Sequence, residues 1–224
     1  MIQAVLFDSD GLLVDTEQLF FEATREAFAI DEAVISPDQW ATWYLSEGKR
    51  SREIGVLLGI PCLQIEETIK YRDLLFRTRL EAGVSVLPGV RETLADLSKN
   101  FRLAVVTGSS RSRFEHVHLS TKLTDFFELV ITSDDYDEPK PDSQCYVKTL
   151  QALSLNPGDC LAVEDSPRGA TAAISAGVRC VVIPTSLTNL ALCPDGCDIL
   201  NNMTELPALI KKGKVSCEST ASSL

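Results

Sequence analysis

The first apolar run of the chain ends abruptly in two acids. Val5, Leu6 and Phe7 are followed by Asp8 and, two residues further on, by Asp10. An apolar run that stops at charged residues is typical of a buried parallel strand, whose carboxyl end lies where ligands bind in open α/β sheets. Two carboxylates on one side of a strand repel each other unless a cation lies between them. The segment therefore indicates a site for a hard divalent cation, with Mg²⁺ as the first candidate. The same residues also suit a surface turn, and other segments decide between the two interpretations.

Beyond Gly89 the chain alternates between apolar, strand-like runs and helical patterns. The predicted strands cover residues 103–106, 128–132, 160–163 and 179–183, and the predicted helices cover residues 90–98, 112–120, 146–153 and 169–176. Such alternation predicts a parallel sheet with right-handed crossovers and helices packed against it. The predicted fold class is α/β, with a three-layer, Rossmann-like core.

No strand-like run occurs between the first acids and residue 86. Helical patterns cover residues 18–30, 38–45, 52–58 and 65–80 instead. We therefore expect an all-helical cap at 17–86, inserted into an α/β core of residues 1–16 and 87–212, with a flexible polar tail at 213–224. An insert that leaves the core beside the paired acids is placed to close over a substrate and exclude water. The alternative is an insert that only adds stability.

A hydroxyl, a glycine and a serine follow the predicted strand 103–106 and precede a predicted helix. They are Thr107, Gly108 and Ser109. The threonine side chain and the backbone N–H groups of its two neighbours are suited to hold phosphate oxygens near the start of a helix. Ordinary capping of the helix by serine explains the same residues, so the segment gains weight only beside the others.

Two further charged segments come after predicted strands and are expected at the same sheet edge. Lys140 lies between two prolines, and its ammonium could neutralise a phosphoryl group or the carboxylate that attacks it. Glu164 and Asp165 end the strand 160–163 and could complete the oxygen shell of a metal. An exposed loop lysine and an ordinary helix start are the alternatives. Two strands that both end in acidic residues are much less expected by chance than a single such strand.

Composition restricts the class of partner. The formal net charge of −11 argues against a nucleic-acid-binding surface, so an anionic substrate requires local positive charge. We see no apolar stretch long enough to span a membrane and no secretory leader. The seven cysteines are odd in number and contain no Cys-x-x-Cys pair, which is typical of reduced thiols. We expect a cytoplasmic protein, monomeric, that acts on a small molecule.

Taken together, the four segments resemble the motifs of the haloacid dehalogenase superfamily of aspartate-nucleophile phosphotransferases. The similarity is greatest to the branch with a helical cap inserted after the first motif, which contains sugar-phosphate phosphatases and β-phosphoglucomutase. The Phe-Asp-Ser-Asp-Gly motif at residues 7–11, followed by Asp-Thr-Glu at 15–17, carries the resemblance most specifically. One departure lies in the third motif, where Ser143 and Gln144 replace a proline and an acid of the family pattern.

The resemblance implies a role for each matched residue. It implies Asp8 as nucleophile, Asp10 as general acid and base, Lys140 as a catalytic cation, Thr107, Gly108 and Ser109 as phosphate-binding residues, and Asp8, Asp10, Asp165 and Glu164 as residues of a Mg²⁺ site, with Asp165 the expected direct ligand. The implied activity is that of a Mg²⁺-dependent phosphatase. It hydrolyses a small phosphorylated metabolite, with a sugar phosphate as the expected class, through an aspartyl-phosphate intermediate.

Four alternatives to a phosphatase are weighed against particular residues. A β-phosphoglucomutase-type enzyme resembles this chain, but Phe20 stands where that mutase has a histidine. A phosphoacceptor domain lacks a cap and the second acid, and a non-catalytic binding protein would have lost one of the matched residues. A dehalogenase proper is not expected to keep Asp10. In the cap, the basic cluster at 48–53 could bring Arg50 or Arg52 to a second anionic group of the substrate, and a solvated helix start is the alternative.

Overall fold

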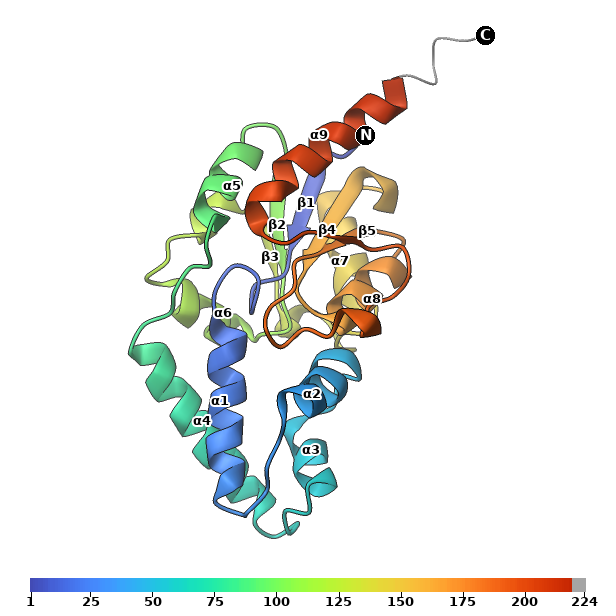
Figure 1. Cartoon of the computed structure of the whole chain (residues 1–224). Helices are drawn as coiled ribbons and strands as arrows, with labels where there is room; N and C mark the ends of the chain where they lie inside the picture. Colours follow the sequence, from blue (N-terminus) through green and yellow to red (C-terminus); the bar gives the residue numbers. More distant parts are fainter. Residues whose placement is uncertain (219–224) are drawn as a thin grey trace.

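The computed structural model describes the backbone of residues 1–218 and the side chains of residues 1–212. Six strands in this part of the chain form one parallel sheet in the order β3-β2-β1-β4-β5-β6 (Figure 1). The strands are β1 (Ala4–Phe7), β2 (Arg102–Val106), β3 (Leu129–Ile131), β4 (Cys160–Glu164), β5 (Arg179–Val182) and β6 (Asp198–Ile199). The predicted α/β class with a Rossmann-like parallel sheet is confirmed.

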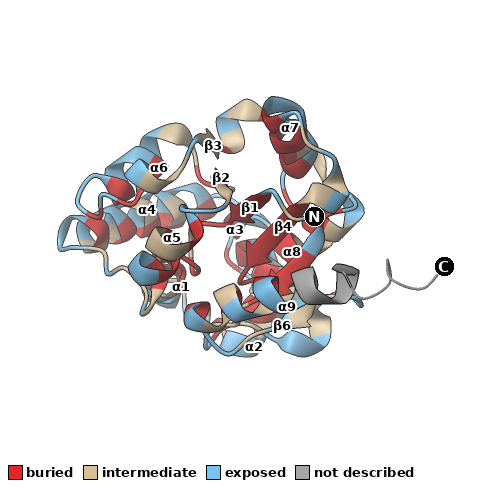
Figure 2. Cartoon of the chain, turned by 90° about the horizontal axis from the view of Figure 1, so that it is seen from above, coloured by how far each residue is buried: buried red, intermediate tan, exposed pale blue. Residues whose placement is uncertain are grey.

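The first strand lies in the middle of the sheet and is buried on both faces (Figure 2). Val5 and Phe7 pack into the larger apolar cluster on one face, whereas Ala4 and Leu6 pack into the cluster on the other. This two-sided burial explains why the strand reads as a continuous apolar run. The chain reverses its direction of winding at β1, between β2 and β4, and the carboxyl end of the sheet at such a point is where a ligand crevice forms.

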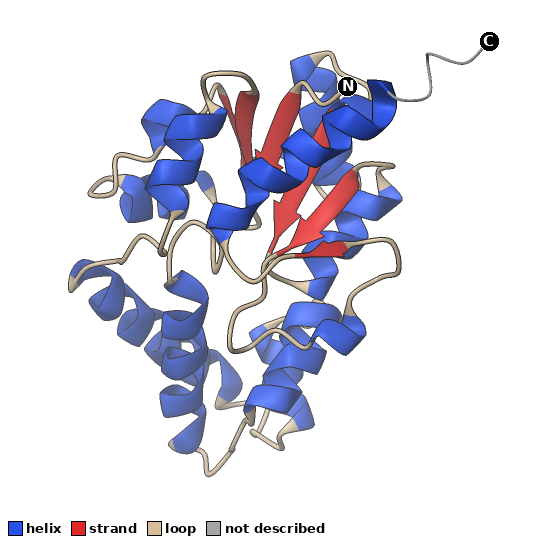
Figure 3. Cartoon of the chain, turned by 45° about the horizontal axis from the view of Figure 1, so that its top comes forward, coloured by secondary structure: helices blue, strands red, loops and turns tan. Residues whose placement is uncertain are grey.

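Helices cover both faces of the sheet (Figure 3). They are α5 (Val90–Leu97), α6 (Arg111–His118), α7 (Gln144–Leu153), α8 (Pro167–Ser175) and α9 (Leu206–Glu218). Short 3₁₀ turns lie at Thr124–Phe126, Ser133–Asp135, Pro157–Asp159, Leu190–Leu192 and Met203–Glu205. Each of α6, α7 and α8 begins one or two residues before the predicted start, so the periodicity located these helices well.

The segment between β1 and β2 is helical up to α5 and extends away from the sheet (Figures 1 and 3). Its helices are α1 (Thr16–Ala29), α2 (Pro37–Trp40), the π-helix Ala41–Ser46, α3 (Ser51–Leu57) and α4 (Ile65–Glu81). α1 and α4 pack along each other. The single helix predicted over 38–45 is an α-helical turn that continues as a π-helix, a form that often marks a functional site.

Two features differ from the sequence-based expectation. Strand β6 was not predicted, because it has only two residues and is held by pairing with β5 at the sheet edge. Helix α9 continues to Glu218, into the segment predicted as a flexible tail, and residues 219–224 lie outside the described residues. Among the described helices, none has the length and apolar character needed to cross a bilayer.

Candidate active site

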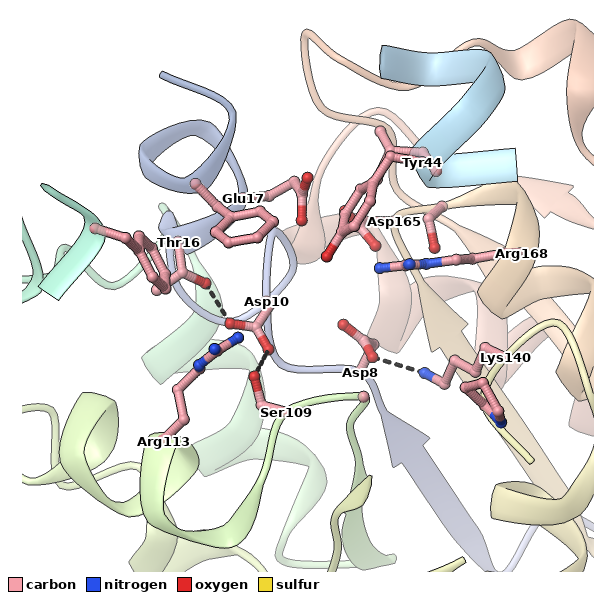
Figure 4. A pocket seen from close by; sticks show the side chains of 16 residues that line it. Asp8, Asp10, Thr16, Glu17, Tyr44, Ser109, Arg113, Lys140, Asp165 and Arg168 are labelled. Atoms are coloured by element: carbon pink, nitrogen blue, oxygen red, sulfur yellow. Dashed lines mark hydrogen bonds and ion pairs between the residues drawn. The ribbon is translucent and has the colours of Figure 1, made fainter. Parts of the chain in front are cut away.

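The four polar segments meet in one pocket at the carboxyl end of the sheet. Asp8 and Asp10 follow β1, Ser109 follows β2, Lys140 lies between β3 and α7, and Asp165 follows β4. All five line a cavity of about 130 Å³ (Figure 4). Each segment leaves a parallel strand at the same sheet edge, which is why residues far apart in sequence converge. This arrangement makes the turn interpretation of the first acids insufficient.

Lys140 joins two acids in the interior. Its Nζ donates hydrogen bonds to Asp8 Oδ1 at 2.6 Å, to Glu164 Oε1 at 2.6 Å and to the carbonyl oxygen of Val106 at 2.9 Å. These three bonds use all the protons of the ammonium. Glu164 also accepts a hydrogen bond from the Tyr146 hydroxyl at 2.5 Å. Lys140 is therefore a fixed charge beside Asp8 rather than an exposed loop lysine.

The same geometry sets the protonation of the pair. Burial raises the pKa of Asp8 to about 7, against the Lys140 ammonium, which favours the carboxylate. For Lys140, burial alone would lower the pKa, but the charges of Asp8 and Glu164 hold the pKa above its usual value. The lysine therefore stays charged at neutral pH, and any added cation near Asp8 favours the ionised, nucleophilic form of that carboxylate.

Asp10 is held by three hydroxyl groups. Its Oδ1 accepts a hydrogen bond from Thr16 Oγ1 at 2.6 Å, and its Oδ2 accepts bonds from Ser109 Oγ at 2.9 Å and Thr107 Oγ1 at 3.2 Å. Thr107 also accepts a bond from the Ser109 backbone N–H at 3.0 Å. Because Thr107 is fully buried and lines no part of the pocket, it orients Asp10, while Gly108 and Ser109 face the cavity.

Three carboxylates form the candidate metal centre. Oxygens of Asp8, Glu164 and Asp165 lie within 4.8 Å of one another, and all three side chains are buried. Asp165 Oδ2 has no hydrogen-bond partner among the described residues, and an unpaired buried carboxylate oxygen is costly. Burial and the charge of Asp8 raise the pKa of Asp165. A divalent cation that prefers oxygen ligands fits this donor set and offsets the repulsion. Asp8 and Asp165 line the pocket, whereas Glu164 does not.

Gly11 and Gly169 make room for these acids. A Cβ at Gly11 would overlap Asp165 Oδ2, and its φ of +79° also disfavours any other residue. A Cβ at Gly169, in α8, would overlap the carboxylate of Glu164. The glycine after the first two acids therefore allows the chain both to turn and to approach the acid that follows β4.

Gln144 fixes the loop that carries Lys140. Its Oε1 accepts hydrogen bonds from the backbone N–H groups of Asp137 and Glu138, and its own N–H donates to Asp142 Oδ1 at 2.8 Å. Gln144 is also the first residue of α7. The departure from the family pattern at Ser143 and Gln144 thus leaves the helix start and the lysine in place.

His118 supports the segment that contains the two acids. Its Nε2 lies 2.9 Å from Ser9 Oγ, its Nδ1 lies 3.0 Å from Thr121 Oγ1, and its ring packs on Phe114. The side chain is 2% exposed, and burial lowers its pKa to about 4. His118 is therefore neutral at physiological pH and acts as a hydrogen-bond bracket for the residue between Asp8 and Asp10.

This bracket predicts a pH effect on stability. Between pH 6.5 and 4, His118 is protonated in the unfolded chain but stays neutral in the folded chain. The contribution of His118 to the free energy of unfolding therefore falls as the pH falls. We expect the stability advantage of the natural chain over His118→Gln to shrink by about 2–3 kcal/mol between pH 7 and pH 4.5. Urea unfolding of both proteins at the two pH values measures the difference. An equal advantage at both values would contradict the assignment.

A second cation–acid group lines the pocket beside Asp165. The Arg168 guanidinium lies 4.3 Å from the centroid of the Tyr44 ring, and the Trp40 indole N–H donates to Glu17 Oε1 at 2.8 Å. Burial raises the pKa of Glu17 to about 7, opposed by Arg168 and by that hydrogen bond. Tyr44 belongs to the π-helix and Arg168 to α8, so this group connects the helical segment to the sheet part of the chain (Figure 4).

Sequence reasoning missed several residues of the lining. Glu17, Phe20, Tyr44, Phe76, Arg113 and Arg168 all face the cavity. A signal existed for Arg113, which lies in the first turn of the helix α6 that follows the Thr107–Ser109 segment.

The structure does not bring the two arginines of the basic cluster to the pocket. Arg50 is exposed where α3 begins, and Arg52 is exposed and paired with Glu66. Gly48, at the start of the cluster, does approach the other part of the chain, since a Cβ there would lie 3.2 Å from the carbonyl oxygen of Lys140. The loop thus reaches the core, but through its backbone.

Comparison with known proteins identifies the family. Residues 5–183 match the family described as haloacid dehalogenase-like hydrolase. The chain is 32% identical over 214 residues to YhcW of Bacillus subtilis, which covers 92% of this chain and 94% of that protein. It is 31% identical over 184 residues to the phosphorylated carbohydrates phosphatase of Thermotoga maritima, which covers 80% and 83%.

A solved structure agrees over nearly the whole chain. A CbbY mutant from Rhodobacter sphaeroides in complex with xylulose-(1,5)bisphosphate superposes with a TM-score of 0.73, at 26% identity, over 92% of this chain and 96% of that one. The range that matches the family, residues 5–183, spans every acid, lysine and hydroxyl that meets at the pocket. Because the family match, the sequence relatives and the geometry of the site agree, we conclude that this chain belongs to the haloacid dehalogenase-like hydrolases.

Proposed function

We propose that this hydrolase is a Mg²⁺-dependent phosphatase that hydrolyses a small phosphorylated metabolite through an aspartyl-phosphate on Asp8. One observation carries the proposal: Asp8 and Asp10 face one pocket, with Lys140 bonded to the first acid and a buried, unpartnered oxygen of Asp165 beside it. This combines a nucleophile, a second carboxylate for proton transfer and a site for a cation.

In the first step, a carboxylate oxygen of Asp8 attacks phosphorus and the bond from phosphorus to the leaving oxygen breaks. Asp10 gives a proton to that oxygen, so the product leaves as a neutral alcohol. The positive charge of Lys140 and the backbone N–H of Gly108 are placed to offset the charge that builds up on the phosphoryl oxygens. The hydroxyls around Asp10 keep its carboxyl group pointed into the cavity.

In the second step, Asp10 takes a proton from a water molecule, whose oxygen attacks phosphorus. The bond between phosphorus and Asp8 breaks, which releases phosphate and restores the free carboxylate. Splitting the hydrolysis into two steps lets one acid serve as proton donor and then as proton acceptor. Asp8, Asp165 and the backbone carbonyl of Asp10 would hold Mg²⁺, which would supply positive charge to offset the phosphoryl oxygens. Glu164 supports this centre through Lys140.

We propose that residues 17–86 act as a cap on a core formed by residues 1–16 and 87–212. Phe20, Tyr44 and Phe76 line the pocket from the helical segment, and the acids line it from the sheet edge. A substrate enclosed between the two is shielded from bulk water while Asp8 reacts.

A sugar phosphate is the substrate class best supported. The Thermotoga relative is named for phosphorylated carbohydrates, and the CbbY structure holds a sugar bisphosphate. In this chain the pocket offers hydroxyl, acidic and basic groups next to aromatic side chains, a mixture suited to a polyhydroxylated ligand. The mutase alternative is disfavoured because Phe20 packs among Trp40, Tyr44 and Phe76 and presents no proton-transfer group.

Phosphate release from a panel of phosphorylated metabolites with Mg²⁺ tests the proposal. We expect free phosphate from at least one sugar phosphate. The panel includes β-glucose 1-phosphate with its bisphosphate activator, because conversion to glucose 6-phosphate without phosphate release would favour the mutase. Absence of phosphate release from every compound and from a generic aryl phosphate would contradict the proposal.

Removal of divalent cations is expected to stop turnover. Without the cation, the charges of Asp8 and Asp165 repel each other and the phosphoryl group, so we expect a loss of at least about 10²-fold in the presence of a chelator. Added Mg²⁺ should restore the rate, and the Asp165→Asn protein should need much more Mg²⁺ for half-maximal activity. Full activity of the metal-free enzyme would refute this assignment.

A further inference from the structure

We propose that Arg113 recognises a second anionic group on the substrate, so that the preferred substrates carry a phosphate or carboxylate besides the phosphoryl group that is transferred. This inference rests on the proposed function and adds a substrate class to it. It starts from the position of one arginine between two cavities.

The reactive pocket continues into a second cavity through Phe76 and Arg113, which line both. The first cavity has a volume of about 130 Å³ and contains the reacting acids, whereas the second, of about 430 Å³, lies between α4 and α6. A substrate whose phosphoryl group lies against Asp8 therefore has space to extend past Arg113. Figure 4 shows the Arg113 side chain reaching from α6 toward the pocket.

Arg113 has no acid of its own among the described residues. Its guanidinium lies 5.5 Å from the centroid of the Phe76 ring, in a cation–π contact that leaves its five N–H donors free for a ligand. Six other arginines among the described residues form ion pairs with carboxylates: Arg52, Arg72, Arg79, Arg102, Arg111 and Arg179. In a chain of net charge −11, an arginine left unpaired at a pocket is available for an anion.

Arg77 adds a second positive charge to this cavity. His116 and the hydroxyl groups of Ser110 and Ser112 also line it. Asp73, the one acid that lines this cavity, accepts a hydrogen bond from Arg72 Nε at 2.8 Å. The positive charge of Arg72 therefore offsets the negative charge of Asp73. Guanidinium and hydroxyl donors at the junction suit a phosphate or a carboxylate, whereas a neutral sugar end would leave the guanidinium unmatched.

The test compares substrates that differ in one anionic group. Fructose 6-phosphate, fructose 1,6-bisphosphate and 6-phosphogluconate present no second anion, a phosphate and a carboxylate, respectively. For the natural chain we expect kcat/KM to be at least about tenfold higher for a compound with the second anion. Arg113→Met should remove that preference mainly through KM, while leaving turnover of fructose 6-phosphate within about twofold. The two anionic compounds show whether the site prefers phosphate or carboxylate.

Arg25→Met is the matched control. Arg25 is likewise an exposed arginine over an aromatic ring, 5.8 Å from the centroid of Phe21, but it lines none of the described cavities. We expect Arg25→Met to keep the preference and Arg113→Lys to keep part of it. Thermal unfolding of each variant checks that the fold is retained.

Binding separates this inference from the proposed function. In the Asp8→Asn background, calorimetric titration with fructose 1,6-bisphosphate should weaken at least about tenfold on adding Arg113→Met, and titration with fructose 6-phosphate should not. Equal binding of the bisphosphate with and without Arg113, or loss of preference in Arg52→Met instead, would overturn the inference. Absence of turnover with every phosphate would defeat the proposed function, whereas these titrations do not depend on turnover.

Discussion

Replacing Asp8 by asparagine is expected to lower phosphate release by at least about 10⁴-fold, the largest effect of any single change in this chain. Asparagine has nearly the same shape but lacks the charge needed to attack phosphorus. Initial rates with an aryl phosphate measure the loss, because its leaving group needs little help from an acid. The change also removes a buried charge that burial disfavours, so the variant is expected to fold.

The neighbouring acid supplies the comparison. Asp10→Asn should cause a large loss with an alkyl phosphate and a smaller loss of the first step with an aryl phosphate, because only the alkyl leaving group depends on protonation. Retention of more than about a tenth of the natural rate by Asp8→Asn, a difference of only about 1.4 kcal/mol in the barrier, would exclude it as the nucleophile.

Loss of Lys140 is expected to damage both activity and stability. Methionine at this position leaves the buried carboxylates of Asp8 and Glu164 without their shared cation. Breaking a buried ion pair in this way typically costs about 3–5 kcal/mol. Loss of the fixed charge beside the phosphoryl group should reduce kcat by a further measurable factor of about 10²–10³. Urea unfolding and steady-state kinetics of the same preparation give the two quantities.

A double variant separates the two effects. Lys140→Met combined with Glu164→Gln has one buried charge fewer, so we expect it to recover part of the lost stability. Activity should stay low, since the ammonium beside Asp8 is still missing. Recovery of activity together with stability would mean that Lys140 acts only through folding.

Most of the sheet was predictable because its strands are buried on both faces. β1, β2, β4 and β5 read as continuous apolar runs for that reason. β6 has no such run, since its first residue, Asp198, points to an ion pair with Arg179 at the edge. Hydrophobic periodicity does not predict the change from α-helix to π-helix after Trp40. This change accompanies long-range contacts among the rings of Trp40, Tyr44 and Phe20.

The residues of the site likewise fall into those that sequence patterns locate and those that they do not. Asp8, Asp10, Lys140 and Asp165 were found because each follows a strand, and strand ends of a parallel sheet meet in space. Thr107 follows the same rule, yet only the coordinates reveal that it faces Asp10 instead of the cavity.

The helical side of the pocket follows no local rule. Tyr44 and Phe76 reach the cavity because of how the helical segment lies over the sheet, and the contact between Tyr44 and Arg168 joins residues more than a hundred positions apart. A basic cluster such as the one at Arg50 and Arg52 is conspicuous in sequence, whereas single arginines such as Arg113 are not. Substrate preference therefore depends on the part of the site that sequence patterns describe least.

The covalent intermediate on Asp8 is the central claim, and trapping it is the most direct test. The Asp10→Asn protein is mixed with Mg²⁺ and an aryl phosphate and quenched in acid, so that the first step proceeds while the second is slowed. Peptide mass spectrometry is expected to find one phosphoryl group on the peptide that contains Asp8, and none in the Asp8→Asn protein. Phosphate release with no phosphorylated peptide, or with the phosphoryl group on another residue, would contradict the account.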